Sequence, residues 1–372
     1  MKQLSIYLVF LITLFIACGE KQKDTAVTPW GENIDSISDE SEFDLIEIQR
    51  SGEMIMLTLT GPQFYYDYRG RHLGTQYLLA ERFASQVGVR LRVEVCRDTI
   101  EMRERLLSGE GDIMATVEVG RLEVCPTKTD LQKELQAWYK PSILEEIRKK
   151  EEYLLSSRSV KRRIFSPMLD RQSGIISHYD GLFMQYCRTI RWDWRLMAAQ
   201  AYQESTFDPK ATSWAGAKGL MQIMPTTADH LGLPRDQMYD PEKSIAAAAK
   251  LIEELEHTFS DISDHRERIN FILASYNGGS HHIRDAMALC QRDGHNHHQW
   301  ANVSEYVLKL EQPKFYCDPI VKYGYMRGSE TADYVAKINQ RWNSYREVKS
   351  PRQYFNQEPR KANQKSRKYN LD

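Results

Sequence analysis

The spacing of apolar residues changes near residue 175, and this change limits the chain to folds with two differently built parts. Between residues 54 and 139, short apolar runs alternate with helical patterns, an order typical of an α/β unit with parallel strands. From 177 to about 345 the spacing is helical throughout, which predicts an all-α domain. A length of 372 residues fits two domains with connections, since one domain takes roughly 100–200 residues.

Charge and hydropathy exclude two classes of protein. The 50 Lys and Arg residues nearly balance the 51 Asp and Glu residues, which leaves a net charge of −1. So balanced a chain lacks the positive field of a dedicated nucleic-acid binder, and we expect no nucleic-acid partner. The only long apolar run lies at the extreme N-terminus, which excludes a polytopic membrane protein.

The N-terminal run has the features of an export signal. Residues 4–17 carry no charge and have the length of a signal-peptide core, short for a membrane-spanning helix. The run ends in the small residue Ala17 followed by Cys18, which resembles a lipobox. We therefore expect a lipoprotein signal peptide at 1–17 and a lipid anchor on Cys18; Gly19 favours the periplasmic face of the outer membrane. The alternative is an ordinary signal peptide followed by a chance cysteine.

Three further segments have the composition of connections or tails. Residues 18–50 are acidic and polar and cannot bury enough apolar surface to fold, so we expect a flexible acidic tether. Residues 142–174 begin with a highly charged helical pattern, which predicts a solvated helical connector. Residues 346–372 hold eight basic and three acidic residues, which predicts a basic disordered tail. The domains then span 51–141 and 175–345.

Cysteines and histidines give no metal or redox motif. Besides Cys18 there are five cysteines, at 96, 125, 187, 290 and 317, without a C-x-x-C pair. Cys96 and Cys125 could pair in an oxidising envelope, and buried free thiols are at least as good an alternative. The histidines at 281, 282, 295, 297 and 298 match no compact ligand set. With no dinucleotide or phosphate-loop motif either, we expect no cofactor and no functional metal.

Glu204 is the first candidate for chemistry. It follows an apolar helical pattern at 194–202, and apolar surroundings would raise the pKa of its carboxyl group and keep it protonated near neutrality. A protonated carboxyl is the general acid that cleavage of a glycosidic bond requires. A single Glu near a helix end is weak evidence, and a paired or surface carboxylate is the ordinary alternative.

Four motifs in a fixed order strengthen the assignment. They are Glu204-Ser205-x-Phe207, Gly219-Leu220-Met221-Gln222, Ala274-Ser275-Tyr276-Asn277 and Glu330-Thr331-Ala332-Asp333-Tyr334. In order and spacing they resemble the catalytic domain of the soluble lytic transglycosylases, which has a goose-lysozyme-like helical fold. The resemblance covers about 165 residues, and it departs from the family pattern only in the residue before Tyr276 and Asn277.

The resemblance implies a role for each matching position. Glu204 is implied as the sole acid and base, and the substrate-binding set as Ser205, Met221, Gln222, Tyr276, Asn277, Glu330 and Tyr334. The implied substrate is the peptidoglycan glycan strand, cleaved at the β-1,4 bond between N-acetylmuramic acid and N-acetylglucosamine. The implied product is a 1,6-anhydromuramyl end, for cell-wall remodelling or turnover. Aromatic faces for sugar rings and amides for N-acetyl groups suit that substrate.

The N-terminal unit has a resemblance of its own. The run from 54 to 117 is similar to the first lobe of the solute-binding-protein-like domain of membrane-bound lytic murein transglycosylases of the F type. Residues 120–139 resemble the returning strand and helix of that lobe, so the second lobe is missing between roughly 115 and 120. The expected fold is therefore α+β and multidomain: a small α/β lobe, half of a periplasmic binding protein fold, followed by an all-α lysozyme-like catalytic domain. With one wall absent, we expect a docking or regulatory remnant in place of a ligand receptor.

Two alternatives to a transglycosylase remain open. Hydrolysis by the same site would need a second carboxylate about 5–9.5 Å from the first, and the nearest in sequence, Asp208, precedes Pro209 and reads as a turn residue. A noncatalytic glycan-binding envelope lipoprotein is the other alternative, although a pure binder has no need of the acid.

Overall fold

The computed structural model describes residues 44–347. The predicted signal peptide at 1–17, the lipidation site Cys18, the tether as far as residue 43 and the tail from residue 348 lie outside the described residues. Among the residues described, no helix is both long enough and apolar enough to cross a membrane.

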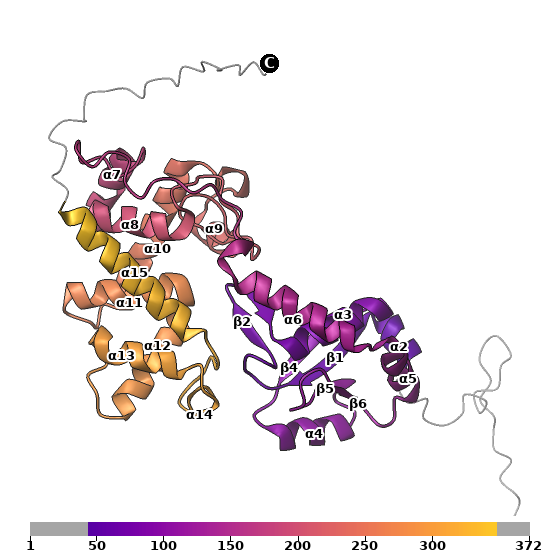
Figure 1. The fold of residues 1–372 in the computed structure, drawn as a ribbon. Coiled ribbons are helices and arrows are strands. Elements are labelled where there is room, and N and C mark those ends of the chain that lie inside the picture. The colour runs from indigo at the N-terminus through magenta and orange to yellow at the C-terminus, as the bar shows by residue number, and fades with distance from the viewer. Residues whose placement is uncertain (1–43, 348–372) are drawn as a thin grey trace, which may run out of the picture. The chain divides into compact units, whose positions relative to one another are not determined.

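An α/β lobe forms the first part of the described chain (Figure 1). Its four-stranded sheet has the order β4-β1-β5-β6; the first three strands are parallel, and β6 runs antiparallel to β5. Helices α3 and α6 lie on one face of the sheet and α4 on the other. The sheet strands are β1 (Glu53–Thr58), β4 (Arg90–Val95), β5 (Ile113–Ala115) and β6 (Leu122–Val124), and the helices are α2 (Leu45–Ser51), α3 (Thr75–Val87), α4 (Thr99–Leu107), α5 (Thr129–Trp138), α6 (Pro141–Leu155) and the 3₁₀ turn η2 (Ser157–Ser159).

A small hairpin outside the main sheet was not expected from the sequence. Strands β2 (Tyr66–Tyr68) and β3 (Arg71–Leu73) pair antiparallel around the two-residue turn Arg69–Gly70. Both turn residues have positive φ, 53° and 68°, as a type I′ turn requires. The strands are only three residues long, too short for an alternating pattern to stand out.

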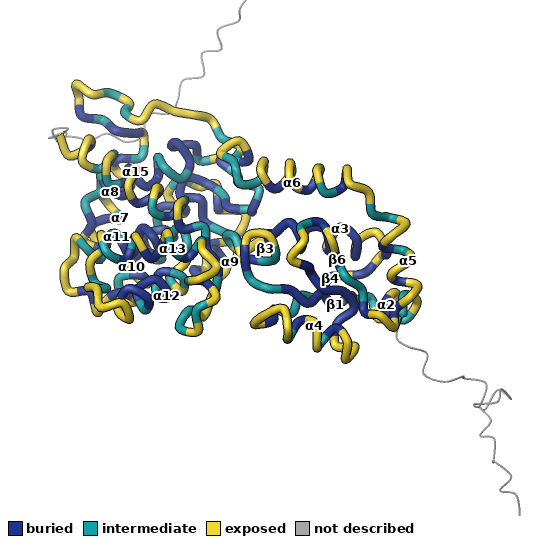
Figure 2. Tube along the Cα trace, turned by 60° about the horizontal axis from the view of Figure 1, so that its bottom comes forward, coloured by how far each residue is buried: buried dark blue, intermediate teal, exposed yellow. Residues whose placement is uncertain are grey.

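Two helices at the borders of the lobe differ from expectation. Helix α2 lies inside the predicted tether and buries Ile48 completely in the lobe core. Helix α6 is an integral part of the lobe and not a solvated connector: Ile143 and Ile147, four residues apart, are buried and form the apolar stripe that the many charges obscure. Figure 2 shows the outer side of α6 exposed beside the largely buried α3. The carboxylate of Glu151 accepts hydrogen bonds from Gly74 and Thr75 at the start of α3.

The segment between β5 and β6, where the resemblance implies that a second lobe is missing, is a short, braced turn. Gln76, which is fully buried, donates from its amide to the carbonyl oxygens of Thr116, Glu118 and Arg121 and accepts from the backbone N–H of Gly120. One side chain therefore contacts four backbone groups of the turn, and the hydroxyl of Thr116 donates to two of the same carbonyl oxygens, those of Glu118 and Arg121.

The second part of the described chain is all-helical, as predicted. Its core is one apolar cluster, to which α8 and α11 contribute fully buried residues such as Leu196 and Ile272. The order of an α/β sheet lobe followed by an all-helical domain is thus confirmed. The helices are α7 (Asp180–Ile190), α8 (Trp194–Ser205), α9 (Pro225–Leu231), η3 (Arg235–Gln237), α10 (Pro241–Thr258), α11 (His265–Gly278), α12 (Ser280–Arg292), α13 (Trp300–Lys309), α14 (Pro313–Tyr316) and α15 (Gly328–Arg346).

The five cysteines in the described part are free thiols. Cys96 and Cys125 are buried in a small apolar cluster with Leu57, Met102 and Met114. Of the two alternatives that the sequence left open, the structure shows buried free thiols.

Candidate active site

Glu204 stands in the last turn of α8, and the chain leaves the helix through a strained backbone. The helix ends at Ser205, and the next two residues, Thr206 and Phe207, have φ of 53° and 64°. This left-handed conformation is rare for residues with side chains of this bulk. The hydroxyl of Thr206 donates to the carbonyl oxygen of Arg163 at 2.7 Å, and a guanidinium nitrogen of Arg162 donates to the carbonyl oxygen of Glu204 at 3.0 Å. Residues just before the helical domain thus hold the end of the catalytic helix in place.

The surroundings of Glu204 leave its carboxyl group poised near neutrality. Burial raises the pKa of Glu204 from 4.5 to about 7, while the charges of Arg69 and Arg162 and the hydrogen bond from Tyr334 lower it in part. The carboxylate of Glu330 adds to the rise. This agrees with the expectation that apolar surroundings keep the group protonated, and a pKa near the working pH suits a group that both gives and takes a proton.

Tyr334 on α15 orients the carboxyl group. Its hydroxyl donates to Oε1 of Glu204 at 2.5 Å and accepts from the side-chain amide of Gln200 at 3.4 Å. Because α8 and α15 pack along each other, the two helices fix the distance between these groups. Burial and the neighbouring Glu204 raise the pKa of Tyr334 well above its ordinary value, so the phenol stays a hydrogen-bond donor.

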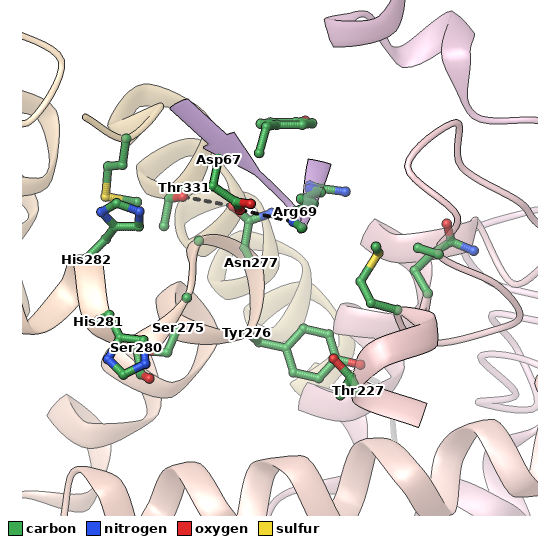
Figure 3. A pocket seen from close by; sticks show the side chains of 18 of the residues that line it. Asp67, Arg69, Thr227, Ser275, Tyr276, Asn277, Ser280, His281, His282 and Thr331 are labelled. Carbon is green, nitrogen blue, oxygen red and sulfur yellow. Dashed lines mark hydrogen bonds between the residues drawn. The ribbon is translucent and has the colours of Figure 1, made fainter. Parts of the chain in front are cut away.

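The loop that carries Gln222 is held by contacts on three sides. The backbone of Gln222 has a φ of 48°, and the side-chain amide of this residue donates to the carbonyl oxygens of Ala211 and Gly219 at 3.1 and 2.9 Å. The hydroxyl of Tyr276 donates to the carbonyl oxygen of Met221 at 2.8 Å. Tyr276 is thereby fixed against the loop, with its ring at the cavity wall (Figure 3).

Two adjoining cavities meet at Glu204. One encloses about 380 Å³ and the other about 220 Å³. Both are lined by Tyr68, Arg69, Glu204, Gln222, Asn277 and Glu330. Space therefore continues on two sides of the carboxyl group.

The residues of the expected substrate-binding set divide into two groups, those that line the cavities and those that do not. Gln222, Tyr276, Asn277, Glu330 and Tyr334 line one or both cavities. Ser205 does not: it is fully buried, and its hydroxyl donates to the carbonyl oxygen of Ala201 inside α8. Because successive helix residues point about 100° apart, the neighbour of a groove residue can face the core.

Met221 is the second correction. Its side chain is fully buried in the core of the helical domain, and only its backbone serves the site, through the contact with Tyr276. Successive side chains of this tight loop point in different directions, so Gln222 lies at the cavity while Met221 lies in the core.

Asp208 takes the structural role expected of it. It is buried, and its carboxylate accepts from the backbone N–H groups of Arg163 and Lys210 at 2.6 and 3.0 Å. Within residues 44–347 no group of three or more metal-binding side chains meets. His281 and His282 instead lie at the far end of the larger cavity (Figure 3).

Sequence reasoning missed the contribution of the α/β lobe. The hairpin β2–β3 brings Tyr68 and Arg69 to the cavities, and both contact Glu330. Gly70 in the turn is the one local signal for this hairpin, and it is a weak one, because the three-residue strands show no clear pattern. Asn277, by contrast, meets a residue of its own domain, accepting from the hydroxyl of Thr331 at 2.8 Å.

Comparison with known proteins shows what parts of this chain are similar to. The transglycosylase SLT domain matches residues 182–299. Membrane-bound lytic murein transglycosylase F of Desulfosudis oleivorans is 40% identical over 147 residues, which cover 40% of this chain and 32% of that protein. The protein of the same name from Maricaulis maris is 38% identical over 165 residues, covering 44% and 35%. The matched part thus spans about a third of the length of these relatives.

Two solved structures match parts of this chain. An inactive variant of lytic transglycosylase Slt from Pseudomonas aeruginosa matches with a TM-score of 0.34 and 20% identity, covering 46% of this chain and 24% of that one. The 70 kDa soluble lytic transglycosylase from Escherichia coli matches with a TM-score of 0.33 and 18% identity, covering 82% and 40%.

Proposed function

We propose that this chain, whose residues 182–299 match the transglycosylase SLT domain and follow an α/β sheet lobe, is a lytic transglycosylase of peptidoglycan. It cleaves the β-1,4 bond between N-acetylmuramic acid and N-acetylglucosamine and leaves a 1,6-anhydromuramyl end. The observation that carries this proposal is Glu204: a carboxyl group with a pKa of about 7, held by Tyr334 where two cavities meet.

The reaction uses one carboxyl group twice. Protonated Glu204 gives its proton to the glycosidic oxygen as the bond to C1 breaks, and positive charge develops on the sugar ring. The resulting carboxylate then takes the proton of the sugar's own 6-hydroxyl, whose oxygen closes on C1. Proton and bond changes balance without water, and an internal nucleophile held close to C1 competes well with the solvent.

The other carboxylates at the cavities support this route over hydrolysis. Hydrolysis needs a second carboxylate that activates water or attacks the sugar. Glu330 is engaged by Tyr68, Arg69 and Arg327, and Asp333 pairs with Lys337 at 2.6 Å. Asp67 accepts from the backbone N–H of Gly70 within its own hairpin.

Substrate binding is assigned to the polar and aromatic groups of the cavity walls. The ring of Tyr276 offers a face for a sugar ring, while the amides of Gln222 and Asn277 suit hydroxyl and N-acetyl groups. Tyr334 serves the carboxyl group directly.

The masses of the products test the function. The full chain, kept in solution with detergent, is incubated with purified peptidoglycan, and the released muropeptides are weighed. We expect anhydromuropeptides, each lighter by one water than its hydrolysed counterpart. Reducing ends would establish a lysozyme-type hydrolase instead, and binding without release would establish a noncatalytic glycan binder.

A dependence on pH follows from the same carboxyl group. The general acid must be protonated in the free enzyme, so kcat/KM is high below the pKa of Glu204 and falls as the pH rises through about 7. Initial rates of release at low substrate concentration, measured between pH 5 and pH 9, give the profile. A rate that stays constant up to pH 9 would contradict the assignment.

We also propose that the protein works at a membrane surface. The names of the relatives describe them as membrane-bound, and Cys18 follows an uncharged run with the features of a lipoprotein signal. A lipid anchor there, on the periplasmic face of the outer membrane, would keep the enzyme beside its insoluble substrate.

A further inference from the structure

The tip of hairpin β2–β3 reaches from the α/β lobe into the candidate active site. Arg69 lines both cavities together with Glu204, and its Nη2 lies 2.8 Å from Oε1 of Glu330. The hydroxyl of Tyr68 donates to both carboxylate oxygens of Glu330, at 2.9 and 3.0 Å. Figure 3 shows Arg69 and Asp67 at the same cavity as Tyr276 and Asn277.

The hairpin is fixed against the helical domain by further contacts. The ring of Tyr68 stacks on Trp214, with centroids 5.9 Å apart and planes within 2°. Nε of Arg71 donates to the carbonyl oxygen of Ala215 at 3.3 Å. The tip therefore meets Glu330 in one defined orientation.

Glu330 connects the hairpin to the general acid. It lies in the first turn of α15, four residues before Tyr334, on the same face of the helix. Tyr334 in turn donates to Glu204. A continuous chain of contacts thus runs from the lobe through one helical turn to the reacting carboxyl group.

Arg69 stands at a turn position whose backbone conformation is unfavourable for arginine. The first residue of a type I′ turn needs positive φ, for which Asn, Asp and Gly are preferred; Arg69 adopts φ of 53° there. The left-handed conformation is unfavourable for residues that carry a Cβ. Such strain is characteristic of residues retained for a task.

We propose that Arg69 and Glu330 form a positioning pair through which the α/β lobe sets the charge and orientation of Glu204. Neither residue transfers a proton: Arg69 places a positive charge beside the acid, and Glu330 both balances that charge and aligns α15. The inference rests on the proposed function, in which Glu204 is the general acid, and gives the lobe a part in that same site.

The direction of each charge effect can be worked out. The groups that face Glu204 are Arg69 from the hairpin, Arg162 from the segment before α7, Tyr276 from α11, and Glu330 and Tyr334 from α15. Loss of a positive charge destabilises the carboxylate and raises its pKa, whereas loss of a negative charge lowers it. Arg69→Asn and Glu330→Gln should therefore act in opposite directions.

Titration of Glu204 itself tests the pair without reference to catalysis. The full chain is labelled with [¹³Cδ]-glutamate, and the signal of Glu204 is identified by its loss in Glu204→Gln. We expect Arg69→Asn to raise the pKa and Glu330→Gln to lower it, each by on the order of 0.5–1 unit. The double variant should return close to the wild-type value, and Arg69→Lys should retain it. Because Asn suits the turn, the first variant keeps the hairpin folded.

The alkaline limb of kcat/KM should move with the titration, upward in Arg69→Asn and downward in Glu330→Gln. A matched control is the exposed pair Arg82–Glu146 within the lobe, whose charges lie 2.8 Å apart; Arg82→Asn and Glu146→Gln should move neither quantity. A purely structural role would lower activity without opposite shifts. Equal or absent pKa shifts in the two variants would overturn the inference, whereas opposite shifts in a protein that releases no anhydro product would uphold it and refute the proposed function.

Discussion

Turnover of purified peptidoglycan should fall by about 10³-fold or more when Glu204 is replaced by glutamine. A positioned general acid contributes roughly 10²–10⁴-fold to a rate, and Glu204 is proposed to serve both as the acid and as the base. Glutamine has nearly the same shape and can still accept from Tyr334, so the fold should be retained. The measurement is the rate of anhydromuropeptide release, alongside the melting temperature.

The control for this variant is Glu253→Gln, an exposed carboxylate on α10. It removes the same charge away from the cavities and should leave the rate unchanged. If Glu204→Gln retained more than about a tenth of the activity with normal melting, another group would have to be the acid.

A large loss of stability is expected for Gly219→Ala. Gly219 begins the loop that carries Gln222, with φ of 78°, and a Cβ there would lie 2.1 Å from the carbonyl oxygen of Met238. Backbone would have to move, so the free energy of unfolding should fall by on the order of 3 kcal/mol. Urea denaturation measures this, and the displaced loop should also lower activity below the unfolding temperature.

Gly232→Ala measures the cost of the backbone conformation alone, because the added Cβ causes no clash. Gly232 follows α9 with φ of 71°, and a Cβ there meets no atom within 4 Å. Only the left-handed conformation is penalised, so the cost should be about 1 kcal/mol. Equal losses in the two variants would show that the contact with Met238 is not rigid.

The general plan of the molecule could be predicted from the sequence because it depends on regular patterns. The alternation of short apolar runs and helical patterns between residues 54 and 139 predicted an α/β unit, and the structure contains one, with elements such as α3 and β4. Glu204 stood out because its motif is continuous in the chain and its helix is apolar.

The missed features depend on contacts between distant segments. Arg69 and Glu330 are 261 residues apart, and nothing in either local pattern indicates the other. In α6, charged residues outnumber the isoleucines that decide its burial, so local composition predicted a solvated connector. For Ser205 and Met221 the motif was recognised, but the direction of each side chain depends on the packing around it.

Attempts to make this protein more heat-resistant would meet a particular conflict. Of the five non-glycine residues with positive φ between 44 and 347, Arg69 and Gln222 line the cavities, and Thr206 and Phe207 directly follow the helix of Glu204. Glycine or asparagine at such positions is a standard route to higher melting temperatures. Here such substitutions would relax the backbone that positions Glu204 and the residues lining the cavities. Variants selected for heat tolerance alone should therefore accumulate substitutions at the cavities and have lower activity.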